Sequence, residues 1–144
     1  MTSFTAESTG KMLFLNLKKG DDLYEGIVQG VKDAGIETGV IVSGIGTLDK
    51  FRYHYINDTN DTPTDIIEVI EGPLEVAVFQ GIILEGKPHI HIVASVHGTK
   101  NYSGHLHEGS TVLYLAEVAI MECKKIPLGR RPGAFGINQF EMLD

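Results

Sequence analysis

Histidines gather in one short segment of this chain. Five of its six histidines lie between positions 89 and 107, namely His89, His91, His97, His105 and His107. Neutral imidazole is the commonest metal ligand in proteins. Three imidazoles with a water in the fourth position form an open, catalytic type of zinc site. The spacing of these histidines therefore decides whether the segment can bind a metal ion.

The segment 88–97 alternates between apolar and other residues, which predicts a β-strand. One predicted face is apolar and consists of Ile90, Ile92, Ala94 and Val96. The other carries His89, His91 and His97. His89 and His91 are then about 7 Å apart at their Cα atoms and can reach one ion. His97 would lie roughly 20 Å farther along the strand, too far to share that ion.

A turn is predicted over 98–104, and His105-Leu106-His107 follows it. If the hairpin turns near position 98, His105 lies opposite His91 and His107 lies opposite His89. Third and fourth histidines then reach the same end of the sheet. The alternative is a polar sheet face on which the histidines are only wetted by solvent.

Two carboxylates are candidates for proton transfer beside such a site. The segment 111–121 is apolar on both predicted faces, so Glu117 is expected to be buried. A buried carboxylate must be compensated, either by an Arg or Lys or by a role at the histidines. Glu108, next to His107, is expected to be a solvated turn residue.

The elements that position these residues can also be predicted. A strand is expected over 11–17, and a helix is expected to begin after Asp22, which has capping-box spacing to Glu25. The apolar stripe of this helix is Leu23, Ile27, Val31 and Ala34, and Gly35 suits its end. Gly26 and Gly30 weaken the helix but would allow it to pack closely on a sheet.

Strands dominate the rest of the chain. They are expected over 40–48, 51–56, 66–70, 74–84, 89–96 and 111–123. Residues 1–10 are expected to be a loose leader and residues 124–144 a surface tail that includes Arg130 and Arg131. Gly44-Ile45-Gly46 is interpreted as a tight turn rather than a nucleotide-binding motif, because no third glycine follows at the required spacing. One α+β domain over 1–144 is predicted, with a largely antiparallel sheet and one or two helices.

Composition limits the classes of function. The chain has 144 residues and a formal net charge of −7, which opposes non-specific binding to nucleic acid or anionic lipid. A single cysteine cannot form an intrachain disulfide, and no run approaches the roughly 20 apolar residues of a membrane span. A cytoplasmic protein with no membrane partner is expected.

The motifs over positions 11 to 123 resemble the plants-and-prokaryotes-conserved (PPC) domain. The resemblance rests on 17–23 (LKKGDDL), 41–48 (IVSGIGTL), 88–91 (PHIH), 103–109 (SGHLHEG) and 116–118 (AEV). The resemblance implies a bent, barrel-like antiparallel sheet and a homotrimer. Within the family, this sequence is similar to the stand-alone bacterial and archaeal type. In that type the matching histidines, His89, His91 and His105, resemble a zinc site. His107 departs from the aliphatic residue that is commoner there.

Three functional hypotheses follow. The first is a PPC-type protein with a zinc site and a DNA-binding or regulatory role that is not settled. The alternative is a zinc-dependent enzyme, a lyase or hydrolase, because the fold also resembles that of acetolactate decarboxylase; Glu117, His107 and Glu108 are its catalytic candidates. The third is a DNA- or partner-binding regulator with a structural metal or none. DNA is a partner implied by the resemblance and opposed by the charge. An open site in a pocket would favour the enzyme, and a closed four-ligand site the regulator.

Overall fold

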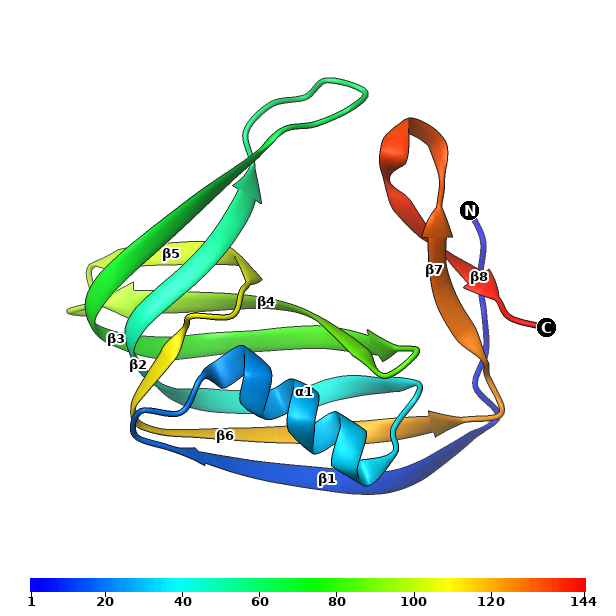
Figure 1. The fold of residues 1–144 in the computed structure, drawn as a ribbon, viewed down its shortest axis with the longest axis horizontal. Coiled ribbons are helices and arrows are strands. Elements are labelled where there is room, and N and C mark those ends of the chain that lie inside the picture. The colour runs from blue at the N-terminus through cyan, green and yellow to red at the C-terminus, as the bar shows by residue number, and fades with distance from the viewer.

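An antiparallel sheet makes up most of the molecule in the computed structural model, which describes residues 1–144. The elements follow in the order β1 (Ser8–Lys18), α1 (Leu23–Ala34), β2 (Gly39–Ile56), β3 (Asp65–Leu84), β4 (Lys87–Val96), β5 (Lys100–Leu106), β6 (Thr111–Lys124), β7 (Leu128–Pro132), the 3-10 turn η1 (Ala134–Gly136) and β8 (Asn138–Met142). Figure 1 shows α1 lying across the strands of the sheet. The structure contains no helix that is long and apolar enough to cross a membrane.

The large sheet has six strands in the order β1-β6-β2-β3-β4-β5, and neighbouring strands are antiparallel. β5 also returns to β2, where Tyr53 pairs with Leu106 and His54 pairs with His105. This pairing closes β2, β3, β4 and β5 into a small ring. The predicted antiparallel sheet is confirmed. The predicted barrel-like form is present only as this local closure.

The helix forms where its sequence signals predicted it. The Asp22 carboxylate accepts a hydrogen bond from the Glu25 N–H at 3.0 Å, which satisfies one of the free N–H groups of the first turn. Gly35 ends the helix with φ at 62°, a left-handed conformation that glycine adopts without strain. Leu23, Ile27 and Val31 are fully buried. The remaining helical segment is the three-residue η1, so the sheet has one packing helix.

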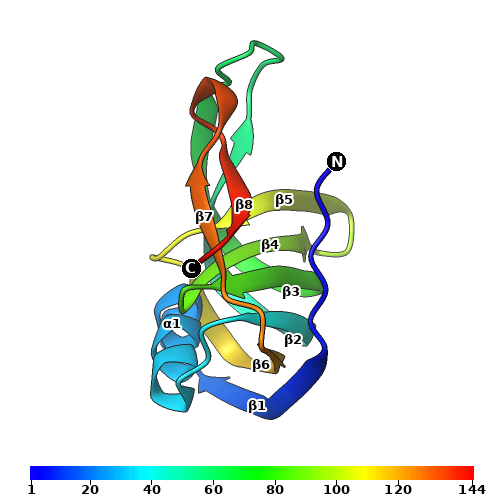
Figure 2. The ribbon, with the colours of Figure 1, turned by 90° about the vertical axis from the view of Figure 1, so that its right-hand side faces the viewer.

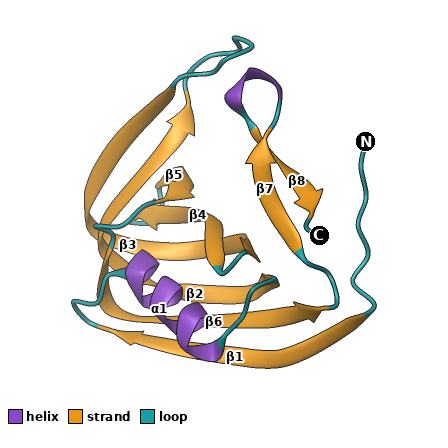
Figure 3. Ribbon diagram, turned by 45° about the vertical axis from the view of Figure 1, so that its right-hand side comes forward, coloured by secondary structure: helices purple, strands orange, loops and turns teal.

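Close packing of α1 on the sheet explains the two glycines in its middle. A Cβ at Gly26 would collide with the Leu17 side chain, and one at Gly30 would collide with that of Leu15. The cost that glycine brings to a helix is therefore offset by burial of the apolar stripe against β1. The hydrophobic core lies between α1 and the inner face of the sheet, and it includes Phe51 (Figure 3).

Gly44-Ile45-Gly46 lies inside β2 and is not a turn, which corrects that prediction. A Cβ on Gly44 would sit 2.5 Å from the Phe79 ring, and one on Gly46 would sit 2.8 Å from the Ala116 Cα atom. Both glycines are therefore required for close approach of neighbouring residues rather than for a left-handed conformation. β3 is also continuous where two separate strands were expected.

Both ends of the chain are more ordered than predicted. The first strand begins at Ser8, so the irregular leader is shorter than 1–10. Within 124–144, β7 and β8 pair as an antiparallel hairpin, which Figure 2 shows beside the sheet. Leu128 in this hairpin is buried, and the Arg131 guanidinium contacts both carboxylate oxygens of Glu85, at 2.8 and 3.1 Å. The segment is thus attached to the large sheet rather than solvated along its length.

Candidate metal centre

His89 and His91 share one face of β4, as their spacing predicted. Ile90 and Ile92, which alternate with them, are buried in the core. The two imidazole rings stack with an interplanar angle of 13°, and their Nε2 atoms lie 3.1 Å apart. This strand therefore presents two nitrogens to one point in space.

His105 on β5 lies directly opposite His91 in the antiparallel register, which confirms the predicted pairing of these two residues. The potential ligand nitrogens of His89, His91 and His105 all lie within 4.8 Å of one another. His97 follows the end of β4 at the turn, is exposed, and does not join the group. The structure thus brings together His89, His91 and His105, the three histidines that the sequence predicted as ligands, and leaves out His97.

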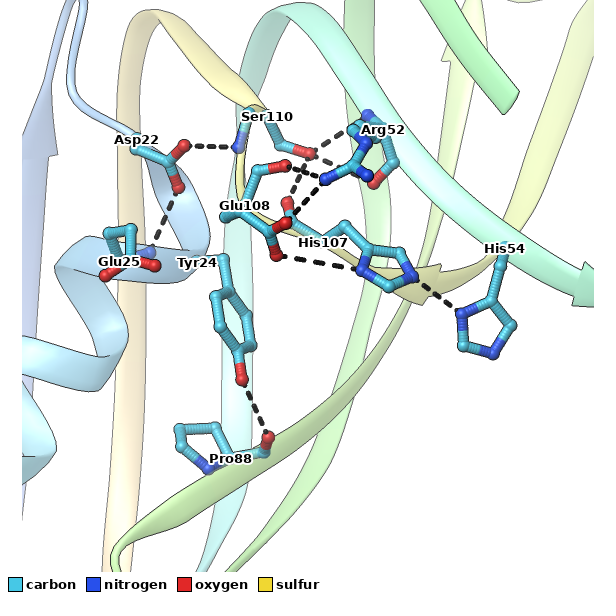
Figure 4. Close-up of polar contacts among 10 residues, drawn as sticks. Asp22, Tyr24, Glu25, Arg52, His54, Pro88, His107, Glu108 and Ser110 are labelled. Carbon is cyan, nitrogen blue, oxygen red and sulfur yellow. Dashed lines mark hydrogen bonds and ion pairs between the residues drawn. The ribbon is translucent and has the colours of Figure 1, made fainter. Parts of the chain in front are cut away.

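His107 does not lie opposite His89, and that part of the prediction is wrong. β5 ends at Leu106, and the His107 N–H donates to the Arg52 carbonyl at 3.0 Å. Its Nε2 atom lies 2.7 Å from the Nδ1 atom of His54. Figure 4 shows the two rings facing each other. The polypeptide thus turns toward β2 after β5, because β2 supplies the backbone partner.

His54 belongs to the site and was missed by sequence reasoning. It lies on β2 opposite His105, and their rings stack with centroids 4.6 Å apart. His54, His105 and His107 form a second group whose ligand nitrogens lie within 4.8 Å of one another. The only signal in the sequence was the alternation of 51–56, which placed His54 on one face of a strand without indicating its neighbours.

Desolvation favours the neutral form of four of these imidazoles, although His89 and His91 are exposed and only His105 and His107 are half-buried. Desolvation lowers the pKa of His89, His91 and His107, and it lowers the pKa of His105 to about 3. A neutral imidazole is the form that binds a metal, so these four histidines need no deprotonation near pH 7. The Nδ1 atom of His105 is buried and has no hydrogen-bond partner in the protein. A bound cation would satisfy such an atom.

Glu117 is exposed, which corrects the prediction that it is buried. Its only hydrogen bond comes from the Asn16 side chain at 3.5 Å, and it pairs across the sheet with Asn16 and Ile45. It contacts none of the histidines, so neither predicted role applies. The outer face of β6 looked like a buried face because it is apolar, yet nothing in the chain covers it.

Glu108 is exposed in the turn after β5, which confirms the prediction of a solvated turn residue, and it also takes part in a polar network. The Arg52 guanidinium donates to its Oε1 atom at 2.6 Å, while its Oε2 atom lies 3.7 Å from the Nδ1 atom of His107. The ion pair with Arg52 lowers the pKa of this carboxyl group. On the other side of the histidine pair, an Asp65 carboxylate oxygen lies 3.7 Å from the Nε2 atom of His54.

A pocket of about 720 Å³ opens beside His89 and His91. Its walls come from β3, β4 and the β7–β8 region, and they include Gln80, Arg130 and Phe140. The Arg130 guanidinium lies 5.5 Å from the centre of the Phe140 ring. A metal bound by the three histidines would therefore face a concave space with a fixed positive charge at its wall. Arg130 was expected to be part of a solvated tail, and the pocket corrects that expectation.

A family model and several solved structures match the chain. The model of the Plants and Prokaryotes Conserved (PCC) domain covers residues 4–124. A plant- and prokaryote-conserved protein from Pyrococcus horikoshii is 27% identical, with a TM-score of 0.80 over 100% of this chain and 99% of that one. A metal-containing protein from Archaeoglobus fulgidus is 26% identical, with a TM-score of 0.80 over 100% of both chains.

Two further matches are less than 25% identical to the chain. A candidate DNA-binding protein from Ralstonia eutropha is 21% identical, with a TM-score of 0.73 over 89% of each chain. The bifunctional protein GlmU of a Synechococcus strain is 20% identical over 122 residues, which is 85% of this chain. The chain spans only 18% of the length of that curated relative, so the activity of GlmU does not transfer to it.

Proposed function

Because the chain belongs to the Plants and Prokaryotes Conserved domain family, we propose that it is a metal-binding member whose zinc ion is held by His89, His91 and His105. The observation that carries the proposal is the convergence of their three ligand nitrogens within 4.8 Å. The donor set suits zinc, which accepts three imidazoles and keeps one position open. The Nδ1 atom of His105 is buried and has no hydrogen-bond partner in the protein, which supports a bound cation beside His105.

The pocket favours a site that handles a small ligand over a purely structural metal. Zinc with an open position polarises a carbonyl group or activates a water molecule. Arg130 on the pocket wall would bind an anionic group of the same ligand. The His107 ring contacts that of His105, and Glu108 lies next to His107, so these two residues are the remaining candidates to transfer a proton. Glu117 contacts none of the histidines and is not a candidate. An enzymatic role is therefore the form of this proposal that the pocket supports.

The metal site is tested by elemental analysis of purified variants. We expect the parent protein to carry zinc and His91→Ala to lose it, since two imidazoles bind zinc far more weakly than three. His97→Ala is the matched control, because His97 lies on the same segment outside the group. Equal loss in both variants, or a parent that binds no zinc, would reject the site.

A homotrimer is the second part of the proposal, and it was implied by the resemblance to the family. The outer face of β1, β6 and β2 exposes large apolar side chains, among them Met12, Phe14, Val42, Ile45 and Leu115. An exposed sheet face this rich in large apolar side chains marks an interaction surface. Burial between copies of the chain would remove it from water.

A further inference from the structure

The pair His54–His107 extends the histidine cluster beyond the site proposed above. Their facing nitrogens, Nδ1 of His54 and Nε2 of His107, lie 2.7 Å apart. Together with a nitrogen of His105 they fall within 4.8 Å of one another. None of these three nitrogen donors comes from His89 or His91.

Carboxylates face the outer nitrogen of each ring in this pair. Asp65 lies 3.7 Å from Nε2 of His54, and Glu108 lies 3.7 Å from Nδ1 of His107. A metal-binding histidine commonly directs its other N–H group at a carboxylate, which fixes the tautomer and makes the ligand more basic. At 3.7 Å these are charge contacts rather than direct hydrogen bonds, and the negative charge favours N–H groups on the outer side and lone pairs on the inner side.

Two inner lone pairs at 2.7 Å repel each other unless a cation or a shared proton lies between them. A shared proton would need only the two rings. It would leave unused a third imidazole, that of His105, which stacks on His54 and has a nitrogen within 4.8 Å of the ligand nitrogens of both rings. A metal ion would use all three rings. Zinc at about 2.0–2.1 Å from each nitrogen requires the His54 and His107 rings to separate by roughly half an ångström.

The charge around the pair suits a divalent ion. Asp65 and Glu108 are the acidic groups that face it, and Arg52 is the basic one. Arg52 is bound to the Oε1 atom of Glu108, which leaves the Oε2 atom directed at His107. Figure 4 shows the line from Arg52 through Glu108 and His107 to His54.

We propose that His54, His105 and His107 form a second divalent-metal site, selective for ions that prefer imidazole ligands, such as zinc or cobalt(II). Because a neutral imidazole offers one lone pair, His105 binds only one ion at a time. The second site shares His105 with the site formed with His89 and His91, but it depends on neither of those residues. The two proposals can therefore fail separately.

Variants that remove one pair of histidines at a time test this proposal. The double variant His89→Ala/His91→Ala is dialysed against zinc chloride, and bound ion per folded chain is measured by elemental analysis. We expect it to retain one ion per chain, and the further change His54→Ala to abolish binding. His97→Ala in the same background is the matched control and should retain the ion. Cobalt(II) absorption bands should appear and disappear with the same variants.

The reciprocal variant His54→Ala/His107→Ala keeps the first site intact and tests it alone. If this variant binds zinc while His89→Ala/His91→Ala binds none, the second site is rejected and the first stands. The second site is also rejected if His54→Ala makes no difference in the double-variant background, or if the histidine pair shares only a proton and takes up no ion.

A positioning role for Asp65 gives a second readout. Asp65→Asn in the His89→Ala/His91→Ala background should weaken zinc binding by roughly 10- to 100-fold, the usual effect of losing a carboxylate behind a ligand. Asp61→Asn, in the loop that precedes β3 and without a hydrogen bond or ion pair to the histidines, should leave the affinity unchanged. Equal affinity in both variants would overturn the assignment of Asp65.

Discussion

His105 is the residue on which the candidate site depends most. It contacts His91 across the β4–β5 pairing and His54 across the β2–β5 pairing, so it belongs to both groups of ligands. Burial that holds its pKa at about 3 also removes it from competition with protons near neutral pH. Neighbouring residues on the same strand have no such position, which makes His105 the point where the two proposed sites join.

At the scale of single residues, the substitution Glu117→Gln tests the placement of Glu117 outside the metal site. Because Glu117 is exposed and touches only Asn16, we expect the free energy of unfolding to change by no more than about 0.5 kcal/mol. Zinc affinity should stay at the parent value, since no histidine contacts this carboxylate. Denaturant unfolding and a competitive chelator titration on one sample measure both quantities. A tenfold loss of zinc affinity in Glu117→Gln would instead show that Glu117 contributes to the metal site.

At the scale of elements, the return of β5 to β2 assembles the cluster. Only two residue pairs join these strands, and one of them is the pair of His54 with His105. Gly104 lies beside this junction, and a Cβ at Gly104 would collide with the His54 carbonyl and approach the Tyr53 ring to 2.8 Å. Absence of a side chain at this position is therefore what allows the two strands to meet.

Gly104→Ala should separate β5 from β2. We expect overpacking to cost roughly 1–3 kcal/mol of stability and metal binding through His54 to weaken, while His89 and His91 remain paired on β4. Ser103→Ala, one position earlier on β5, is the control for strand propensity and should behave like the parent. Thermal unfolding and zinc titration in the His89→Ala/His91→Ala background measure the two effects. If Gly104→Ala unfolds at the parent temperature and binds zinc with the parent affinity, then the contact between β5 and β2 does not require glycine at this position.

At the scale of the whole molecule, we expect the exposed apolar face of β1, β6 and β2 to be covered by another copy of the chain. Ile45 on this face and Ile67 on the β3 segment after the long loop are each 54% exposed, so they form a matched pair for mutation. Ile45→Lys places a charge on the proposed interface opposite Glu117, whereas Ile67→Lys changes an equally exposed residue away from that face. Light scattering after size exclusion should give a trimer for the parent and Ile67→Lys, and a smaller species for Ile45→Lys.

A trimeric parent that tolerates both substitutions would reject this face as the interface. A parent that is monomeric at all concentrations would reject the trimer itself. Both outcomes leave the site of His89, His91 and His105 untouched, because these residues lie on β4 and β5 rather than on β1, β6 or β2.

DNA binding is also decided by the whole molecule, through its net charge of −7. Phosphate backbones repel a negative chain, and non-specific complexes typically have dissociation constants of about 10⁻⁴–10⁻⁶ M at physiological salt. We expect this protein to bind duplex DNA no more tightly than that. Fluorescence anisotropy with a mixed-sequence duplex at about 150 mM salt checks this expectation. Sub-micromolar affinity there would instead support the DNA-binding role that the family resemblance implies.

Local sequence signals were enough for the parts of this protein whose contacts lie close together in the chain. The cap at Asp22, the glycine after the helix and the alternation along β4 each depend on neighbours a few residues away. The pairing of His91 with His105 was predictable for the same reason, because a short turn fixes the register of a hairpin.

Contacts between distant segments were decided only by the tertiary structure. His54 is 51 positions before His105, and nothing in the local pattern of either strand determines that β5 returns to β2. Glu117 was misplaced because an apolar strand face looks the same whether it is covered by the chain's own core or left exposed. The sequence alone thus determined the helix, most strands of the large sheet and the grouping of His89, His91 and His105, while long-range closure of the sheet decided the places of His54 and His107.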